Sequence, residues 1–250
     1  MSQSTTQEET HLPGVRNELD GGSGQFFDAI AHRYDLLNRI LSMGLDPHWR
    51  KKAVRALDLS EATRALDVAT GTADLAMEIV RRHPNVQVDG IDPSVEMLAI
   101  GDQKLQKKSL TDRITLQEGD GLALPFEDNT FDGTAVSFGI RNFPDRLKGL
   151  QEMTRVTRPG GKVVILELSE PRKGPMAAMA RLYVHHAVPR IGSLLSGSKE
   201  YRYLQESIAA FPPAEEFAEM MRTVGLENIE VHPLTFGVVN LFVGTPSVSG

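Results

Sequence analysis

Hydrophobic residues follow two alternating spacings along most of the chain. Short apolar runs of strand length are separated by segments in which apolar residues recur every three to four positions, as on one face of a helix. Strands and helices that alternate in this way predict a mostly parallel sheet with helices on both faces. The predicted strands cover residues 64–70, 86–91, 114–118, 131–138 and 162–168, and the helices between them cover 73–82, 94–107 and 146–157, followed by a turn over 158–161.

The alternation ends in one more helix and two closely spaced strands. The helix covers 214–224 and ends before Gly225. The strands cover 227–234 and 238–244, close enough in sequence to form a hairpin. The predicted α/β fold is therefore a parallel sheet closed by an antiparallel hairpin, which is more specific than a generic doubly wound fold.

Two helical segments lie outside this alternation. Residues 26–57 carry apolar positions on one face, and Pro47 suits the start of a second helix, so they predict an N-terminal helical cap. Residues 174–210 interrupt the alternation with helical stretches and predict an inserted lid. We expect a single domain over 26–244, a polar disordered arm over 1–25 and a flexible tail over 245–250.

The composition narrows the classes of function. At 250 residues and 40% hydrophobic content, the chain can bury a sizeable core. A formal net charge of -6 argues against a nucleic-acid-binding surface, which requires clustered lysine and arginine. The chain has no cysteine, which rules out disulfides and cysteine-ligated metals and fits a reducing compartment. No apolar run reaches about 18 residues, so we expect a cytoplasmic protein with, at most, peripheral contact at the inner face of the membrane.

The turn after the first predicted strand has the features of a nucleotide site. Gly71 lets the backbone approach a ligand, and Thr72 supplies a hydroxyl and an amide at the start of a helix. Ligands bind across the carboxyl ends of parallel strands, so this turn also has the right position. The motif alone is weak, because an ordinary glycine turn between a strand and a helix has the same pattern.

Acidic residues follow the next two predicted strands. The Asp92 carboxylate could accept hydrogen bonds from two ribose hydroxyls, although it could instead cap the next helix. Asp120 could accept from an adenine amine, with Gly121 leaving room for the ring; a plain turn is the alternative. The motif G-x-G-x-x-G is absent around Gly71, which weakens a pyrophosphate-binding interpretation.

Segments in this order resemble the successive motifs of the class I S-adenosylmethionine-dependent methyltransferases. They cover residues 66–75, 90–98, 118–125, 131–142 and 155–169. Within that class, the chain is similar to the C-methyltransferases of demethylmenaquinone and ubiquinone biosynthesis. The residues that carry this closer similarity are 34–38 with Ser42 and Trp49, 137–142, 158–161 with Glu167 and Ser169, and 189–193.

The resemblance implies a Rossmann-like seven-stranded sheet and S-adenosylmethionine as cofactor. It implies that Thr72, Asp92, Asp120, Gly121 and Ser137 contact the cofactor, whereas Asp67 organises the loop and the helix amides. The chain departs from the family pattern at Leu37, Asp46, Ala69, Ala73 and Thr157, none of which removes a proposed polar contact.

Methyl transfer to a ring carbon sets the chemical requirements. Transfer from a sulfonium is an in-line displacement that needs alignment and exclusion of water, and no metal. An ortho hydroxyl must ionise and a ring proton must leave, which calls for a base or a bridging water. His186 is the candidate base, although it could be a packed or surface residue. Arg141 could stabilise a quinol oxyanion or position water, or form a structural ion pair with a loop carboxylate.

Other side chains suggest a route by which an acceptor enters. Tyr34, Asn38, Tyr201 and Tyr203 are candidate lid residues, with core packing expected for at least two of them. Residues 176–195 fit either an adaptable entrance for an isoprenoid tail or a core helix. The expected partner is a prenylated quinol, and a homo-oligomer or a biosynthetic complex is left open.

The resemblance favours methylation of demethylmenaquinol to menaquinol. Methylation of 2-methoxy-6-polyprenyl-1,4-benzoquinol, alone or in addition, is the first alternative. A methyltransferase for another small molecule, such as a sterol or a phenolic oxygen, is the second. A cofactor-binding regulatory subunit without catalysis is the alternative from a different class.

Overall fold

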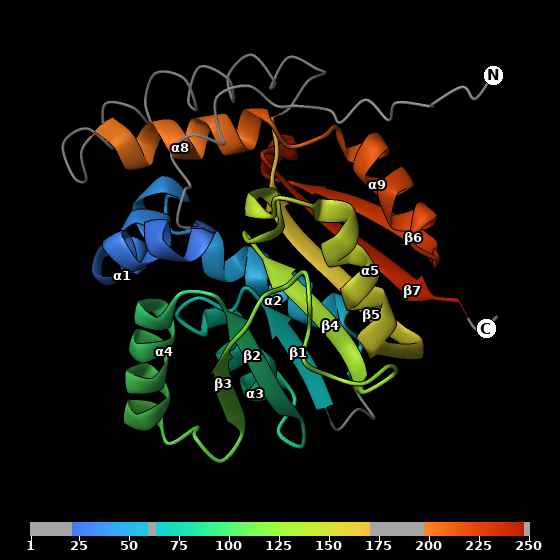
Figure 1. Ribbon diagram of the computed structural model, residues 1–250, viewed down its shortest axis with the longest axis horizontal. Coiled ribbons are helices and arrows are strands. Elements are labelled where there is room, and N and C mark those ends of the chain that lie inside the picture. The colour runs from blue at the N-terminus through green and yellow to red at the C-terminus, as the bar shows by residue number, and fades with distance from the viewer. Residues whose placement is uncertain (1–21, 60–63, 171–197, 248–250) are drawn as a thin grey trace, which may run out of the picture.

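The computed structural model describes residues 22–59, 64–170 and 198–247 (Figure 1). A seven-stranded sheet in the order β3-β2-β1-β4-β5-β7-β6 forms its centre. The strands are β1 (Arg64–Val68), β2 (Gln87–Asp92), β3 (Ile114–Glu118), β4 (Phe131–Ser137), β5 (Thr157–Leu168), β6 (Leu226–Leu234) and β7 (Val239–Pro246). The helices are α1 (Gly22–Leu41), α2 (Asp46–Ala56), α3 (Asp74–Arg82), α4 (Val95–Lys108), α5 (Arg146–Val156), α8 (Ser198–Ala209) and α9 (Ala214–Thr223), with short 3-10 turns η2 (Ile140–Asn142) and η4 (Thr235–Gly237).

The strand directions confirm the predicted fold. The first five strands run parallel, whereas β7 pairs antiparallel with both β5 and β6. The hairpin β6–β7 therefore closes the sheet. Its turn, η4, lies at the carboxyl end of β5, because Leu168 is paired with Val239 and Val239 with Leu234.

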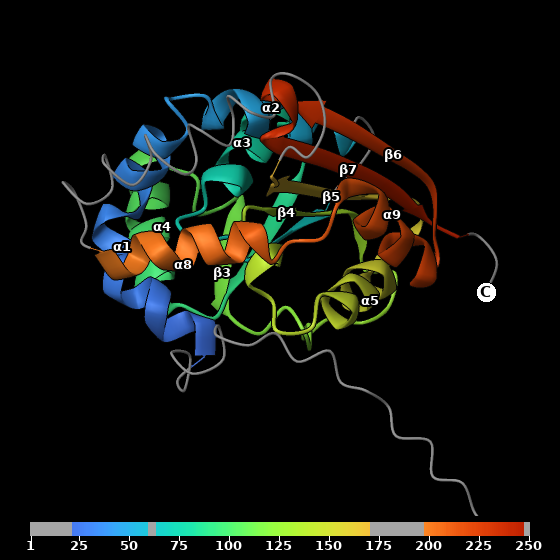
Figure 2. The same ribbon diagram turned by 90° about the horizontal axis from the view of Figure 1, so that it is seen from above.

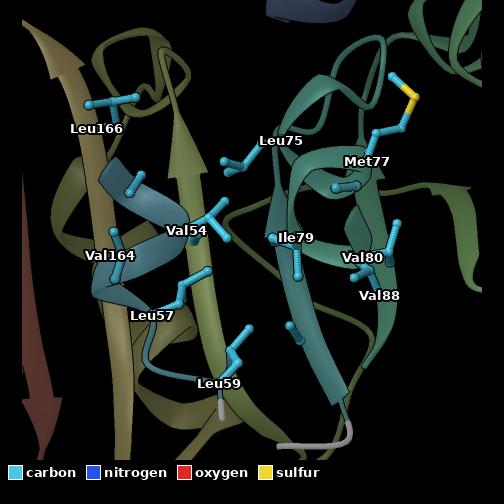
Figure 3. Packing of buried hydrophobic residues seen from close by; sticks show 14 of the residues in the cluster. Val54, Leu57, Leu59, Leu75, Met77, Ile79, Val80, Val88, Val164 and Leu166 are labelled. Atoms are coloured by element: carbon cyan, nitrogen blue, oxygen red, sulfur yellow. The ribbon is translucent and has the colours of Figure 1, made fainter. Parts of the chain in front are cut away.

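Apolar side chains fill both faces of the sheet. One cluster joins the strands to α2 and α3, and Figure 3 shows Val54 of α2 and Leu57, which follows this helix, beside Val164 of β5. The second cluster joins the opposite face to α5 and α9. Figure 2 shows these two groups of helices on opposite sides of the sheet. This three-layer packing holds the strand ends in fixed positions.

The predicted turn over 158–161 is wrong in one respect. The fifth strand already begins at Thr157, which pairs with Phe131, and the register then shifts before Gly133 pairs with Lys162. A buried hydrogen bond of 2.6 Å joins the hydroxyls of Thr157 and Thr134 and fixes this early start. The intervening residues form a bulge within the strand rather than a turn before it.

The chain ends also differ from the predicted boundaries. α1 begins at Gly22, inside the arm predicted over 1–25, and β7 continues to Pro246, inside the tail predicted over 245–250. α8, over Ser198–Ala209, confirms a helical stretch within the predicted insertion over 174–210. Residues 1–21 and 171–197, which include the rest of the predicted lid, lie outside the described residues. Among the helices in the described ranges, none is long and apolar enough to span a membrane.

Candidate active site

The proposed site residues gather at the carboxyl ends of neighbouring strands. Gly71 follows β1, Asp92 ends β2, Asp120 follows β3 and Ser137 ends β4. Because β1 lies between β2 and β4, loops from these strands meet at one edge of the sheet. The cap helix α1 and the helix α8 lie over this edge (Figures 1 and 2). Residues that are far apart in the sequence therefore lie at one edge of the sheet.

Asp67 organises the loop between β1 and α3. One oxygen of its buried carboxylate accepts from the Thr70 hydroxyl at 2.7 Å and from the Ala76 amide at 3.0 Å. Burial raises the pKa of Asp67 to about 7. Gly71 has a φ of +54°, and Ala69 and Ala73 also have positive φ. Alanine carries a strain of about 1 kcal/mol or more in this conformation, so the loop shape is enforced by its surroundings.

Asp92 joins the first two loops. Its Oδ2 accepts from the Gly71 amide at 2.8 Å and its Oδ1 accepts from the Ser94 amide at 2.9 Å. Burial raises the pKa of Asp92 to about 6, and the charge of Asp28 adds to this rise. The N-cap of α4 is Ser94, whose hydroxyl accepts from the Met97 amide, so the capping alternative for Asp92 is wrong. Each oxygen keeps acceptor capacity for a further donor.

The Thr72 hydroxyl is held by side chains from two helices. It donates to Asp35 of α1 at 2.7 Å and accepts from Lys104 of α4 at 2.8 Å. Lys104 also forms ion pairs with Asp35 at 2.5 Å and with Asp74 at 2.9 Å. The Thr72 hydroxyl has no proton left to donate, so a ligand could contact Thr72 only through the remaining acceptor site of the hydroxyl or through the backbone.

Asp120 and Gly121 form a turn after β3. The exposed Asp120 carboxylate accepts from the Leu122 amide at 2.9 Å. A Cβ atom at the buried Gly121 would lie 2.6 Å from Cζ of Phe143, so the small residue is required by this ring. The expectation that Gly121 leaves room for an aromatic ligand overlooked Phe143, which has no distinguishing spacing in the sequence.

Several buried polar atoms near these loops have no partner. Within the described residues, the unpartnered buried side-chain atoms are Asn38 Nδ2, His83 Nε2, Ser137 Oγ, Arg141 Nε and Arg146 Nε. All except that of His83 belong to residues at or over the strand ends. An unpaired buried polar group costs about 1–3 kcal/mol, so these atoms have hydrogen-bonding capacity that a water or a polar ligand can satisfy.

Arg141 forms a buried ion pair, as in the structural alternative to its predicted substrate-side role. Its Nη1 lies 2.8 Å from Oε1 of Glu167 and also donates to the carbonyl of Phe138, and its amide donates to Glu167 at 3.1 Å. Glu167 is fully buried in β5, so the partner is a strand carboxylate rather than the expected loop carboxylate. Arg141 also lies close to Tyr34 and Tyr203: burial raises the pKa of both hydroxyls, and the positive charge of Arg141 opposes this rise.

Two of the predicted lid residues form an aromatic contact over the site. Phe27 meets Tyr34 and Tyr203 edge-on, with ring centroids 6.0 and 6.5 Å apart. The Tyr203 hydroxyl donates to Asn142 at 3.1 Å, which ties α8 to η2. Burial raises the pKa of Tyr34 above its ordinary value. His186, the candidate base, lies outside the described residues.

Sequence reasoning missed the charged contacts that attach α1. Asp28 accepts from the Ser94 hydroxyl at 2.6 Å and from the Glu96 amide at 3.2 Å. With the Lys104 ion pairs, these contacts join α1 to α4 at two points. Charged residues at such positions have the pattern of any solvated helix face, so no sequence signal distinguished them.

Comparison with known proteins gives relatives that match most of the chain. A demethylmenaquinone methyltransferase from Deinococcus radiodurans is 45% identical over 93% of this chain and 96% of its own length. A ubiquinone/menaquinone biosynthesis C-methyltransferase UbiE from Geotalea daltonii is 44% identical over 88% of this chain and 94% of its own. Among solved structures, a SAM dependent methyltransferase from Aquifex aeolicus has a TM-score of 0.62 at 18% identity, covering 87% of this chain and 97% of its own.

These matches agree with the geometry at the strand ends. The structural likeness, at this low identity, supports the fold alone. The sequence matches reach further, because they extend over the cap, the sheet and the hairpin. The model of the ubiE/COQ5 methyltransferase family covers residues 17–246, and this chain belongs to that family.

Proposed function

We propose that this protein uses S-adenosylmethionine to methylate a ring carbon of demethylmenaquinol, giving menaquinol. This proposal rests on the 45% identity, over 93% of the chain, to a relative named demethylmenaquinone methyltransferase. Other relatives are named for both ubiquinone and menaquinone biosynthesis. Methylation of a prenylated benzoquinol is therefore the second candidate function.

Residues at the strand ends fit the proposed cofactor. Asp92 would accept from the ribose hydroxyls through the acceptor capacity that its two hydrogen bonds leave free. Ser137 offers a buried hydroxyl without a partner, and Gly71 offers backbone that a ligand can approach. Thr72, Asp120 and Gly121 complete the proposed set. When bound, S-adenosylmethionine supplies an electrophilic methyl group on a sulfonium.

On the acceptor side, the chain must exclude water and move protons. The contacts of Phe27 with Tyr34 and Tyr203 support a closed arrangement of α1 and α8 over the reacting groups. We assign Arg141 a positioning role, in which its unpartnered Nε holds a water or the acceptor. His186 remains the candidate base, and His186→Gln should lower kcat across a pH series. Unchanged kcat would remove it from that role.

A peripheral membrane contact is part of the proposal, because the acceptor carries its prenyl tail in lipid. Phe236 in η4 and Met43, between α1 and α2, are 70% and 64% exposed. The indole of Trp49 in α2 donates to Thr235 at 2.8 Å and joins η4 to α2. The outward side of α2 carries Lys51 and Arg55, which suit an anionic lipid surface.

The test is a comparison of acceptors under reducing conditions. The purified protein and S-adenosylmethionine are incubated with demethylmenaquinol, 2-methoxy-6-polyprenyl-1,4-benzoquinol, a sterol and a simple phenol, and methylated products are measured by mass spectrometry. We expect the highest kcat/KM with demethylmenaquinol. Cofactor binding without turnover on either quinol would contradict the proposal and favour a regulatory subunit.

A further inference from the structure

Arg146 occupies an unusual position for a cation. It is the first residue of α5, where the helix dipole disfavours positive charge. Asp145, the N-cap, accepts from the Lys148 amide at 2.9 Å and so satisfies the helix end without Arg146. The Arg146 side chain therefore does not stabilise the helix that it begins.

The charge of Arg146 is not matched by a carboxylate. Its Nη2 donates to the Arg141 carbonyl at 3.0 Å, and its Nε is buried without a partner. Across the ranges that the structure describes, no ion pair involves Arg146, whereas the neighbouring Arg141 is paired with Glu167 at 2.8 Å. Of the two guanidinium groups only Arg141 is paired with the buried Glu167, so the negative charge of Glu167 acts on Arg146 from beyond ion-pairing distance. Burial accordingly lowers the pKa of Arg146.

The surroundings of Arg146 suit an aromatic ring with a polar substituent. The ring of Phe211 lies 5.8 Å from the guanidinium carbon. The Tyr203 hydroxyl, which donates to Asn142, belongs to the helix that covers this edge of the sheet. Burial raises the pKa of Tyr203, so this hydroxyl stays protonated at neutral pH and adds no second negative charge beside Arg146.

We propose that Arg146 binds the ionised hydroxyl oxygen of the acceptor ring, while Arg141 holds the surrounding loop through Glu167. This inference rests on the proposed function. The hydroxyl proton leaves to a base or a water, and the resulting phenolate activates the ortho carbon. A carbon–carbon bond to the methyl group then forms as the carbon–sulfur bond breaks. Loss of the ring proton to solvent restores the aromatic quinol. A cation that has no ion-pair partner stabilises the phenolate more than a cation that is already paired with Glu167.

The test compares Arg146→Gln with Arg141→Gln and with Arg158→Gln, a surface control on β5. With demethylmenaquinol as substrate, Arg146→Gln should lower kcat by about 100-fold at neutral pH, the effect of losing one oxyanion donor. Its rate should recover as pH rises, because the hydroxyl then ionises without help. Arg146→Lys should restore part of the activity at neutral pH, and cofactor affinity measured by calorimetry should stay the same. Arg158→Gln should match the wild type.

A second measurement does not depend on turnover. The wild-type protein should bind 1-naphthol and lower its apparent pKa, followed by the absorbance of the naphtholate, and Arg146→Gln should return this pKa toward its value in water. Wild-type kcat in Arg146→Gln, an unshifted naphthol pKa in the wild type, or a shift that is abolished by Arg141→Gln and kept by Arg146→Gln would overturn the inference. If the wild type shifts the naphthol pKa but methylates no quinol, the anion site stands and the proposed function fails. If Arg146→Gln does not fold, Arg146→Lys decides by the same two measurements.

Discussion

At the scale of single residues, two buried carboxyl groups control the proposed cofactor site. Asp67 holds the β1–α3 loop through two hydrogen bonds, and Asp92 connects this loop to the start of α4. Burial raises the pKa of both groups, to about 7 and about 6. These carboxyl groups therefore have different tasks: Asp67 maintains the loop, and Asp92 also keeps acceptor capacity for a ligand.

The raised pKa of Asp67 makes stability depend on pH. Its ordinary value is 3.8, so the folded state binds this proton more tightly, and the stabilisation is present at acid pH and lost as pH rises from about 4 to 7. Asp67→Asn should reduce the difference in unfolding free energy between pH 5 and pH 8 by about 2 kcal/mol. Urea denaturation without cofactor measures this difference. The exposed Asp102→Asn is the control, and an unchanged difference in Asp67→Asn would contradict the prediction.

Replacement of Asp92 should weaken cofactor binding. Asp92→Ala removes a buried carboxylate that we expect to accept from the ribose, so affinity should fall by roughly 1.5–3 kcal/mol, or about 10- to 150-fold. Isothermal titration calorimetry measures the dissociation constant, and Asp102→Ala on α4 should leave it unchanged. A wild-type constant in a folded Asp92→Ala variant would remove this residue from the site.

At the scale of elements, α1 is attached to the sheet domain by charge as well as by apolar packing. Asp28 binds the start of α4 and Asp35 binds Lys104 further along the same helix. The aromatic contact between Phe27 and Tyr34 involves the neighbours of these two aspartates along α1. Such a helix can open when its few polar contacts break and water takes their place, and the entry of a large acceptor requires such opening.

Lys104 should determine how firmly α1 is closed. Lys104→Gln removes two ion pairs and the hydrogen bond to Thr72, so amides of α1 should exchange about 10-fold faster, equivalent to about 1.4 kcal/mol. Hydrogen–deuterium exchange with mass spectrometry measures this effect. Lys107→Gln, an exposed change one turn away, should have no effect. Equal exchange in both variants would show that the contacts of Lys104 do not hold α1 closed.

The helix α8 should behave as the described part of a lid. Tyr203 ties it to η2 by one hydrogen bond, so we expect α8 to exchange faster than β1 and β5 in the empty protein. S-adenosylmethionine together with a quinol analogue should slow this exchange. Protection of α8 equal to that of 64–69 and 163–166 without ligand would make it permanent core and would end the lid hypothesis.

At the scale of the whole molecule, the fold was predictable because it depends on periodicity. Alternating strands and helices indicated the parallel sheet, and the short spacing of β6 and β7 indicated the hairpin. The gathering of Asp67, Asp92 and Asp120 also follows from topology, because carboxyl ends of parallel strands share one edge. Contacts between separate elements were not predictable. No spacing in the chain reveals side-chain directions. These directions determine the ion pair of Lys104 with Asp35, the contact of Phe143 with Gly121, and the absence of an ion pair at Arg146 within the described residues.

The face that carries Phe236 should mediate contact with lipid. Phe236 and Met43 both hold positive φ, 59° and 51°, so strained turns display these exposed apolar side chains beside the basic side of α2. The protein should sediment with phosphatidylglycerol vesicles and much less with phosphatidylcholine vesicles. Phe236→Ser and Lys51→Glu should each weaken this binding by roughly 10-fold, because burial of an aromatic ring and each nearby basic residue contribute about 1–3 kcal/mol. Lys107→Glu makes the same change of charge on α4 and should have less effect. Equal binding to both vesicle types, or equal losses in Lys51→Glu and Lys107→Glu, would show that this face has no specific role at the membrane.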